Sequence, residues 1–174
     1  MVTRPVAVLI GPPGSGKTTV GRTLAARLNV ALHDTDAAVE VVAGKTIADV
    51  FIDDGEPAFR ALERAEVARA LAQESGVLAL GGGAPMDPAT ADALAGHRVV
   101  MLDVGIADAA KRVGFDQSRP LLAVNPRASW VALMKERRPT YERLARHRVD
   151  TAGRTPEEIA AEIVALLRAD EGQA

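Results

Sequence analysis

A glycine-rich segment near the N-terminus constrains the fold of this chain more than any other feature. Residues 11–18, Gly-Pro-Pro-Gly-Ser-Gly-Lys-Thr, match the pattern G-x-x-x-x-G-K-[ST] at every fixed position. The apolar run 6–10 before it is typical of a strand buried on both faces. After it, Val20, Leu24 and Leu28 recur on one helical stripe. The segment is therefore expected to be a phosphate-binding loop between a strand and a helix, rather than a chance glycine turn.

Each part of this loop has a physical role in binding a phosphate chain. Glycines such as Gly14 and Gly16 let backbone N–H groups curl around an anion, and the following helix presents its positive N-terminus. Lys17 is expected to reach the β- and γ-phosphates of a nucleotide, and Thr18 is expected to bind magnesium.

The length and the order of the apolar segments predict one α/β domain over all 174 residues. Strand-like runs alternate with helical patterns, which favours a parallel sheet covered on both faces, with ligands at the carboxyl ends of the strands. A short second strand is expected at 30–33. The helical pattern 128–146 is expected to break at Pro139, and the capping box Thr-Pro-Glu-Glu at 155–158 opens a last helix.

The composition argues against several classes of function. Lys and Arg number 21 against 23 Asp and Glu, a net charge of −2, so nucleic-acid binding is not expected. Without cysteine the chain can form no disulfide and has no thiol nucleophile. The apolar run 6–10 is far shorter than the ~20 residues of a spanning helix. No membrane span or export signal is expected, and a reducing cytoplasm fits.

Two aspartates follow the second expected strand. If the chain stays extended, Asp34 and Asp36 share a face about 6.5 Å apart. The nearer carboxylate could then bind magnesium through water while the other meets a substrate hydroxyl, as phosphoryl transfer to an alcohol requires. The alternative is that they cap a helix and carry solvated charge.

Three glycines at 81–83 follow the apolar run 77–80. They predict close approach of a substrate to the backbone at the rim that also carries the phosphate loop. The alternative is a plain turn before Pro85.

Arginines supply the candidate anion contacts. Arg60 stands four residues after Glu56, a spacing that alone indicates only a weak surface pair. Residues 135–154 hold seven Lys or Arg against three acidic residues, and most of these are expected to face solvent. The long connection 114–127 is typical of a lid, so Arg119 is the candidate cation that covers the γ-phosphate.

Taken together, these segments resemble shikimate kinases over about residues 6–168. The resemblance rests on the phosphate loop, Asp34-Thr35-Asp36, Asp54-Gly55-Glu56 with Phe59-Arg60, Gly81-Gly82-Gly83, Arg119-Pro120-Leu121-Leu122, and Arg137 ahead of Tyr141. Many kinases share the phosphate loop, whereas the other motifs in this order are far more specific.

The resemblance implies a three-layer, nucleoside-monophosphate-kinase-like fold with a five-stranded parallel sheet in the order 2-3-1-4-5. It implies transfer of the γ-phosphate of ATP, with Mg²⁺, to the 3-hydroxyl of shikimate in aromatic amino-acid (chorismate) biosynthesis. The enzyme would be a cytoplasmic monomer. Its substrate-binding region would span about 34–62 and its lid about 114–127.

The same resemblance implies the site residues. Asp36 would bind the ring hydroxyls, either as a general base or only to orient them, and Arg60 and Arg137 would hold the carboxylate. The catalytic residues would be Lys17, Asp36 and Arg119. The shikimate contacts would be Asp36, Arg60, Gly82, Gly83 and Arg137. The ATP contacts would be Gly14, Ser15, Gly16, Lys17, Thr18, Thr19, Arg112, Arg119, Arg154 and Pro156, and the magnesium ligands Thr18 and Asp34.

Two other functions share part of this pattern. A gluconate kinase or a nucleotide kinase would share the loop and the fold, but would not need Arg60 and Arg137 to converge on a carboxylate. A regulatory module that binds nucleotide without catalysis is disfavoured, because it would have no use for the full set of candidate catalytic side chains.

Overall fold

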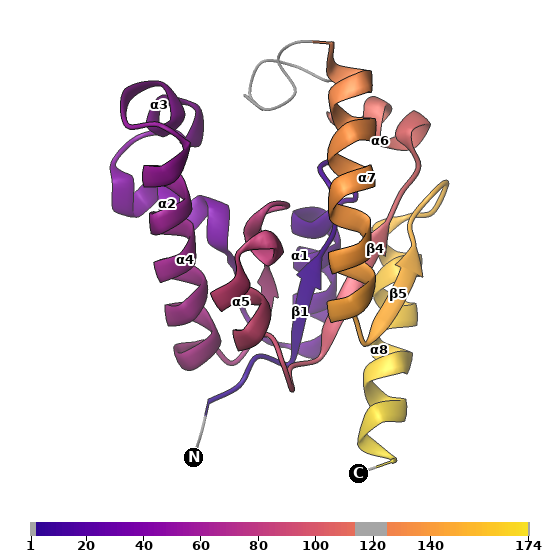
Figure 1. Ribbon diagram of the computed structural model, residues 1–174. Coiled ribbons are helices and arrows are strands. Elements are labelled where there is room, and N and C mark those ends of the chain that lie inside the picture. The colour runs from indigo at the N-terminus through magenta and orange to yellow at the C-terminus, as the bar shows by residue number, and fades with distance from the viewer. Residues whose placement is uncertain (1–2, 114–124, 174) are drawn as a thin grey trace.

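The computed structural model describes residues 3–113 and 125–173 (Figure 1). Its centre is one sheet of parallel strands in the order β2-β3-β1-β4-β5, which confirms the order implied by the resemblance. The strands are β1 (Ala7–Ile10), β2 (Leu32–Asp34), β3 (Val77–Ala79), β4 (Val99–Asp103) and β5 (His147–Asp150). Their carboxyl ends point upward in Figure 1, away from both chain termini.

Helices connect the strands and lie on both faces of the sheet. They are α1 (Lys17–Leu28), α2 (Thr35–Ala43), α3 (Ile47–Asp53), α4 (Glu56–Gln73), α5 (Pro88–Ala93), α6 (Ile106–Val113), α7 (Pro126–Leu144) and α8 (Pro156–Glu171), with a short 3₁₀ turn η1 (Ala84–Met86). Among the helices described, none combines the length and the apolar content that crossing a membrane requires.

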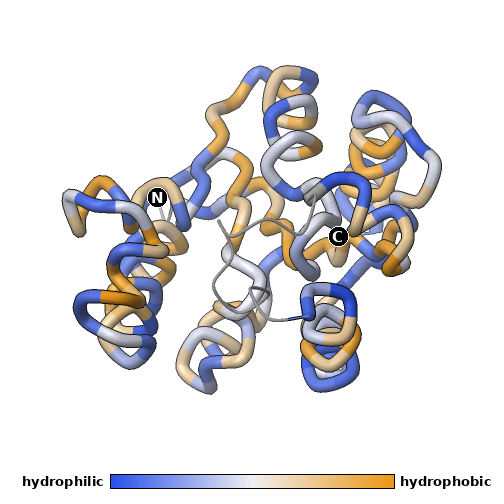
Figure 2. Tube along the Cα trace, turned by 90° about the horizontal axis from the view of Figure 1, so that it is seen from above, coloured by the Kyte–Doolittle hydropathy of each residue, from blue (hydrophilic) through white to orange (hydrophobic). Residues whose placement is uncertain are grey.

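Alternate side chains of the strands point into two separate apolar layers, one on each face of the sheet. Val8 and Ile10 of β1 pack with side chains of α4 and α7 on one face. Ala7 and Leu9 pack with α1 and α8 on the other. Because successive side chains of a strand point to opposite faces, a central strand buried on both sides must be apolar throughout. Figure 2 shows hydrophobic segments concentrated in the middle of the molecule, between the helices.

Helices α2 and α3 form an extension at one end of the sheet, at the upper left of Figure 1. A small third cluster of Val39, Val50 and Phe59 joins them to α4. Thr46 caps α3 by accepting a hydrogen bond from the backbone N–H of Asp49 (3.1 Å). Phe59 lies in the first turns of α4, so this cluster anchors the part of the helix that carries Arg60.

The expected break at Pro139 is wrong, because α7 runs through it. Proline lacks the N–H of one helical hydrogen bond. However, Trp130 before it and Tyr141 after it are both buried in the same apolar layer, which holds the two halves of the helix against the sheet. The helix also begins earlier than expected, so Pro126 and Arg127 belong to it rather than to a lid.

Candidate functional site

A cleft of about 480 Å³ opens at the carboxyl edge of the sheet. The phosphate loop, the end of β2, the glycine triplet and the beginning of α8 contribute to its walls. Its lining contains every expected ATP contact except Arg119, which lies outside the described residues. The lining residues are Gly14, Ser15, Gly16, Lys17, Thr18, Thr19, Val20, Asp34, Asp36, Leu80, Gly82, Arg112, Arg154, Pro156 and Ile159.

The loop after β1 has the backbone shape of an anion cradle. Gly14 and Gly16 have φ angles of 81° and 88°, a left-handed conformation that favours glycine. Gly16 is the N-cap of α1 and offers no side-chain cap, so the first N–H groups of the helix remain suited to an anion. The ammonium group of Lys17 donates to the carbonyl oxygens of Gly11 (2.8 Å) and Pro12 (3.1 Å), which places it over its own loop.

Side chains from distant elements fix the outer side of this loop. Arg112 of α6 donates to the carbonyl oxygen of Gly14 (3.2 Å) and to that of Thr151 (2.6 Å), which joins the loop to the end of β5. The indole N–H of Trp130 donates to the carbonyl oxygen of Pro13 (2.8 Å). The family resemblance implies an ATP contact for Arg112, whereas nothing in the sequence singles out Trp130.

Arg154 and Pro156, two further expected ATP contacts, lie at the beginning of α8. Arg154 donates to the carbonyl oxygen of Asp150 (2.8 Å) and pairs with Glu162 (2.6 Å). These contacts keep the guanidinium group at the rim of the cleft.

Asp34 both caps a helix and faces the phosphate loop, so the two interpretations of this residue hold together. One carboxylate oxygen accepts from the N–H groups of Asp36 (3.0 Å) and Ala37 (3.1 Å) at the beginning of α2. The other accepts from the hydroxyl of Thr18 (2.5 Å). The expected extended pair is wrong, because the helix begins at Thr35 and Asp36 lies in its first turn. Aspartate is a favoured N-cap residue, and capping starts the helix here.

The contact between Thr18 and Asp34 brings together two oxygen donors of the kind that Mg²⁺ prefers. Within residues 3–113 and 125–173, no cluster of three or more His, Cys, Asp or Glu side chains has the arrangement of a metal site. Mg²⁺ commonly takes one or two protein ligands and completes its shell with water and substrate phosphates. The pair therefore fits a nucleotide-bound magnesium ion rather than a site built by protein alone.

Two arginines approach neighbouring residues of the glycine triplet. A Cβ atom on Gly83 would lie 2.7 Å from Nη2 of Arg60, and one on Gly82 would lie 3.2 Å from Nη1 of Arg137. A carboxylate oxygen of Asp36 lies against the preceding glycine. Only residues without side chains allow this approach. The two arginines, from α4 and α7, thus meet at the rim that holds the phosphate loop.

Glu63 is a buried acid that the sequence does not single out, apart from its spacing of three residues after Arg60. Its side chain is 3% exposed and accepts a hydrogen bond from Nη1 of Arg60 (2.8 Å). Burial raises the pKa of Glu63, although the charge of Arg60 opposes the shift. The expected surface pair of Arg60 with Glu56 is also present, at 3.4 Å. Arg60 is therefore held on one side by two carboxylates.

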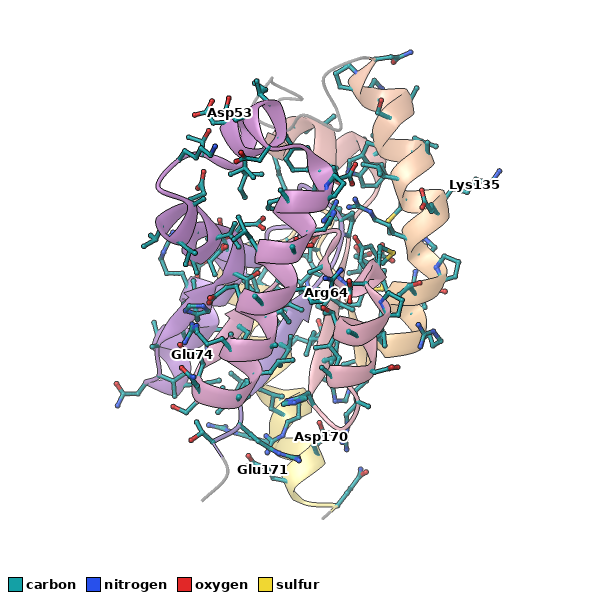
Figure 3. The ribbon with its side chains drawn as sticks, turned by 60° about the vertical axis from the view of Figure 1, so that its left-hand side comes forward. Asp53, Arg64, Glu74, Lys135, Asp170 and Glu171 are labelled. Atoms are coloured by element: carbon teal, nitrogen blue, oxygen red, sulfur yellow. The ribbon has the colours of Figure 1, made fainter. Side chains whose placement is uncertain are left out.

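Arg137 differs from its basic neighbours in burial. It is 6% exposed, whereas Lys135 projects from α7 into solvent (Figure 3). Most of the basic residues between 135 and 154 lie at the surface, as expected.

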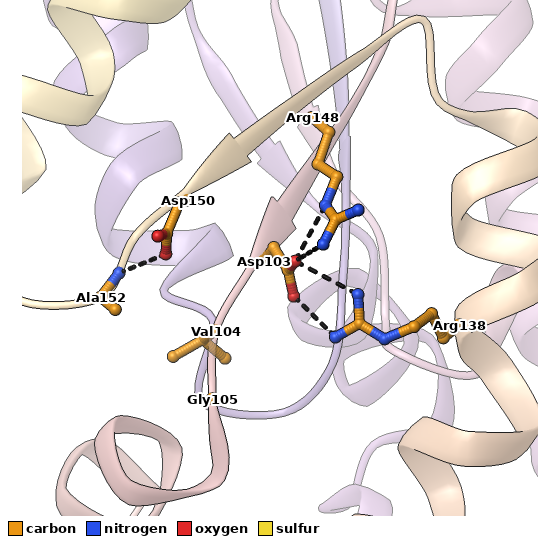
Figure 4. Close-up of a pocket in the computed structure, with 7 residues that line it drawn as sticks. All are labelled: Asp103, Val104, Gly105, Arg138, Arg148, Asp150 and Ala152. Atoms are coloured by element: carbon orange, nitrogen blue, oxygen red, sulfur yellow. Dashed lines mark hydrogen bonds and ion pairs between the residues drawn. The ribbon is translucent and has the colours of Figure 1, made fainter.

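A second hollow, of about 460 Å³, lies beside the carboxyl ends of β4 and β5. Figure 4 shows Asp103 at its wall, between Arg138 (3.0 Å) and Arg148 (2.6 Å). Burial alone would raise the pKa of Asp103, but hydrogen bonds from the two arginines outweigh it and hold the pKa below its usual value. Glu142 pairs with both arginines as well, at 3.3 and 3.2 Å, so two carboxylates balance two guanidinium groups. The side chains beside this hollow therefore form a structural ion cluster.

We expect Asp103→Asn to lower the free energy of unfolding by about 1–2 kcal/mol at neutral pH. This range is modest because both arginines are partly exposed. A carboxylate with a lowered pKa stabilises the fold above its ordinary pKa of 3.8, and this contribution is lost as the pH falls through the folded pKa. Denaturant unfolding at pH 7 and at about pH 3 should therefore show the two proteins converging in acid.

The control is Asp53→Asn, which alters an exposed carboxylate on α3 (Figure 3). It should change stability by less than about 0.5 kcal/mol. If Asp103→Asn lowered the free energy of unfolding by the same amount at both pH values, the assignment of Asp103 to an ion cluster would be contradicted.

Comparisons with known proteins agree with this geometry. A family model described as Shikimate kinase matches residues 13–168. A shikimate kinase of Thermobifida fusca is 62% identical over 165 residues, which cover 95% of each chain. A shikimate kinase of Salinispora arenicola is 58% identical over 165 residues, 95% of this chain and 99% of the relative.

Solved structures give the same result. A shikimate kinase from Acinetobacter baumannii in complex with shikimate superposes with a TM-score of 0.92 at 32% identity, over 97% of this chain and 94% of the other. A gluconokinase from Sinorhizobium meliloti superposes with a TM-score of only 0.59 at 20% identity, over 97% and 94% of the two chains. The latter likeness shows a shared fold alone.

Proposed function

The chain belongs to the shikimate kinase family, and on that premise we propose that it transfers the γ-phosphate of ATP to the 3-hydroxyl of shikimate. The products are shikimate 3-phosphate and ADP. The observation that carries the proposal is the approach of Arg60 and Arg137 to adjacent glycines beside the phosphate loop. Planar guanidinium groups bind a carboxylate through paired, charge-assisted hydrogen bonds. A small acid is thereby held with its hydroxyls near the nucleotide.

The loop residues supply the nucleotide half of the reaction. Phosphoryl transfer passes through a loose transition state, so the protein contributes mainly position and electrostatic stabilisation. The N–H groups of Gly14 and of the residues after it bind phosphate oxygens, and Lys17 stabilises the charge on the β- and γ-phosphates. Arg112, Arg154 and Pro156 flank the adenine. Arg119 is assigned to cover the γ-phosphate on the basis of the family resemblance.

Thr18 and Asp34 would hold magnesium together with the nucleotide. When bound, the ion neutralises the phosphate charge that builds up during transfer. The short contact between the two side chains supports this assignment.

Asp36, Gly82 and Gly83 form the acceptor side together with the two arginines. Asp36 lies in the cleft and against the glycine triplet, so it faces both the nucleotide and the acceptor. It accepts hydrogen bonds from the ring hydroxyls and so directs the reacting oxygen toward the γ-phosphate.

A panel of acceptors tests the proposed function. ATP consumption is measured by a coupled assay with shikimate, gluconate and several nucleoside monophosphates, each against an acceptor-free control. We expect turnover with shikimate and only background rates with the others. Turnover of gluconate or a nucleotide in the absence of turnover with shikimate would refute the proposal.

We also propose that the protein acts as a cytoplasmic monomer. Size-exclusion chromatography with light scattering should give a mass near 18.2 kDa. A mass of twice that value would exclude the monomer.

A further inference from the structure

The chain has one tryptophan and one tyrosine, and both lie on α7. Trp130 is 4% exposed and Tyr141 is fully buried. Each aromatic ring has a single polar hydrogen, and a buried ring usually finds some acceptor for it. Here the acceptors are carbonyl oxygens of two different loops of the candidate active site.

Tyr141 contacts the glycine triplet. Its hydroxyl donates to the carbonyl oxygen of Gly82 (2.5 Å). Arg137, one helical turn earlier, approaches the same glycine. Because a trans peptide is planar and its N–H points opposite to its carbonyl, this bond also fixes the direction of the N–H of Gly83. A glycine-rich segment otherwise has wide conformational freedom.

Trp130 donates a hydrogen bond to the phosphate loop in the same way. Its indole N–H donates to the carbonyl oxygen of Pro13 (2.8 Å). The same peptide plane contains the N–H of Gly14, one of the groups expected to bind phosphate. The bond therefore sets the orientation of part of the anion cradle.

The helix between these two residues is firmly attached to the sheet. Trp130, Met134 and Tyr141 all belong to the apolar layer that includes Ile10 and Leu80, the last residues before the two loops. Displacement of α7 would therefore disturb buried contacts under both loops.

We propose that Trp130 and Tyr141 are positioning residues that orient one peptide group in each loop and so align the nucleotide with the acceptor. This inference deepens the proposed function and rests on it for the identity of the acceptor. Neither side chain needs to touch a substrate. Removing the hydrogen bond of Tyr141 should weaken binding of the acceptor only, and removing that of Trp130 should weaken binding of the nucleotide only.

The test compares Tyr141→Phe, Trp130→Phe and Met134→Ala. Tyr141→Phe removes one hydroxyl and should raise KM for shikimate about fivefold, the equivalent of about 1 kcal/mol for one hydrogen bond. Its KM for ATP should stay within about twofold of the wild type. Trp130→Phe should show the reverse pattern, with the larger increase in KM for ATP.

Met134→Ala is the control for lost packing, because Met134 is buried on the same helix between the two aromatic residues. It should lower the melting temperature and leave both KM values within about twofold. The inference is overturned if Met134→Ala also raises KM for one substrate and not for the other. It is overturned as well if either aromatic variant raises both KM values equally, or raises neither of them.

Calorimetry with ADP separates this inference from the proposed function. Wild-type turnover with shikimate tests the proposed function and is measured first. ADP binding does not depend on the acceptor, so Trp130→Phe should weaken it about fivefold and Tyr141→Phe should leave it unchanged. Unaltered ADP affinity in Trp130→Phe overturns the inference even if the wild type phosphorylates another acceptor.

Discussion

Lys17→Met should abolish measurable turnover, a loss of at least about 10³-fold, while the affinity for shikimate stays within about twofold. Methionine keeps much of the length and apolar stem of lysine but has no charge to stabilise the transferring phosphate. The acceptor contacts lie on α2, α4, α7 and the glycine triplet, so they should persist. A coupled assay measures turnover, and calorimetry measures shikimate binding.

The matched control is Lys135→Met, since Lys135 is an exposed lysine on α7 (Figure 3). It should retain wild-type rates. If Lys17→Met kept more than about a tenth of the wild-type activity, the role of the phosphate loop would have to be abandoned.

Arg137→Ala should raise KM for shikimate about 100-fold and change KM for ATP by less than about threefold. The substitution removes a buried, charge-assisted contact to the acceptor carboxylate, which is worth about 2–3 kcal/mol. Arg137 lies beside Gly82 and away from the adenine side of the cleft, so nucleotide binding should be largely unaffected. Steady-state kinetics with each substrate varied in turn gives both constants.

Two further variants make this measurement specific. Lys135→Ala removes an exposed positive charge from the same helix and should leave both constants unchanged. Arg137→Lys keeps the charge but loses the planar fork, so its KM for shikimate should fall between those of the wild type and the alanine variant. Equal increases in both KM values for Arg137→Ala would contradict the assignment of Arg137 to binding of the acceptor.

Local patterns in the sequence predict much of the fold. The phosphate loop and the capping box at Thr155 each depend on a few neighbouring residues, and the structure contains both. The apolar runs similarly predict the central strands, because burial on both faces leaves no room for polar side chains. The sheet order followed from the family resemblance rather than from these patterns.

Features that depend on tertiary contacts were not predictable in the same way. Asp36 is expected in an extended segment, but α2 begins at Thr35, directly after Asp34, whose carboxylate caps the helix. Pro139 was expected to end a helix that packing keeps intact. Glu63 and Trp130 carry no motif. The partner of Trp130, Pro13, is 117 residues away in the sequence, and Glu63 differs from a surface acid only in being buried beside Arg60.

The proposed function depends most on Arg60 and Arg137 binding together the carboxylate of one small acid beside the phosphate loop. A crystal structure with ADP and shikimate tests it most directly. We expect carboxylate oxygens within hydrogen-bonding distance of both guanidinium groups, about 2.7–3.2 Å, with a ring hydroxyl at Asp36. A carboxylate bound elsewhere, or held by neither arginine, would contradict it.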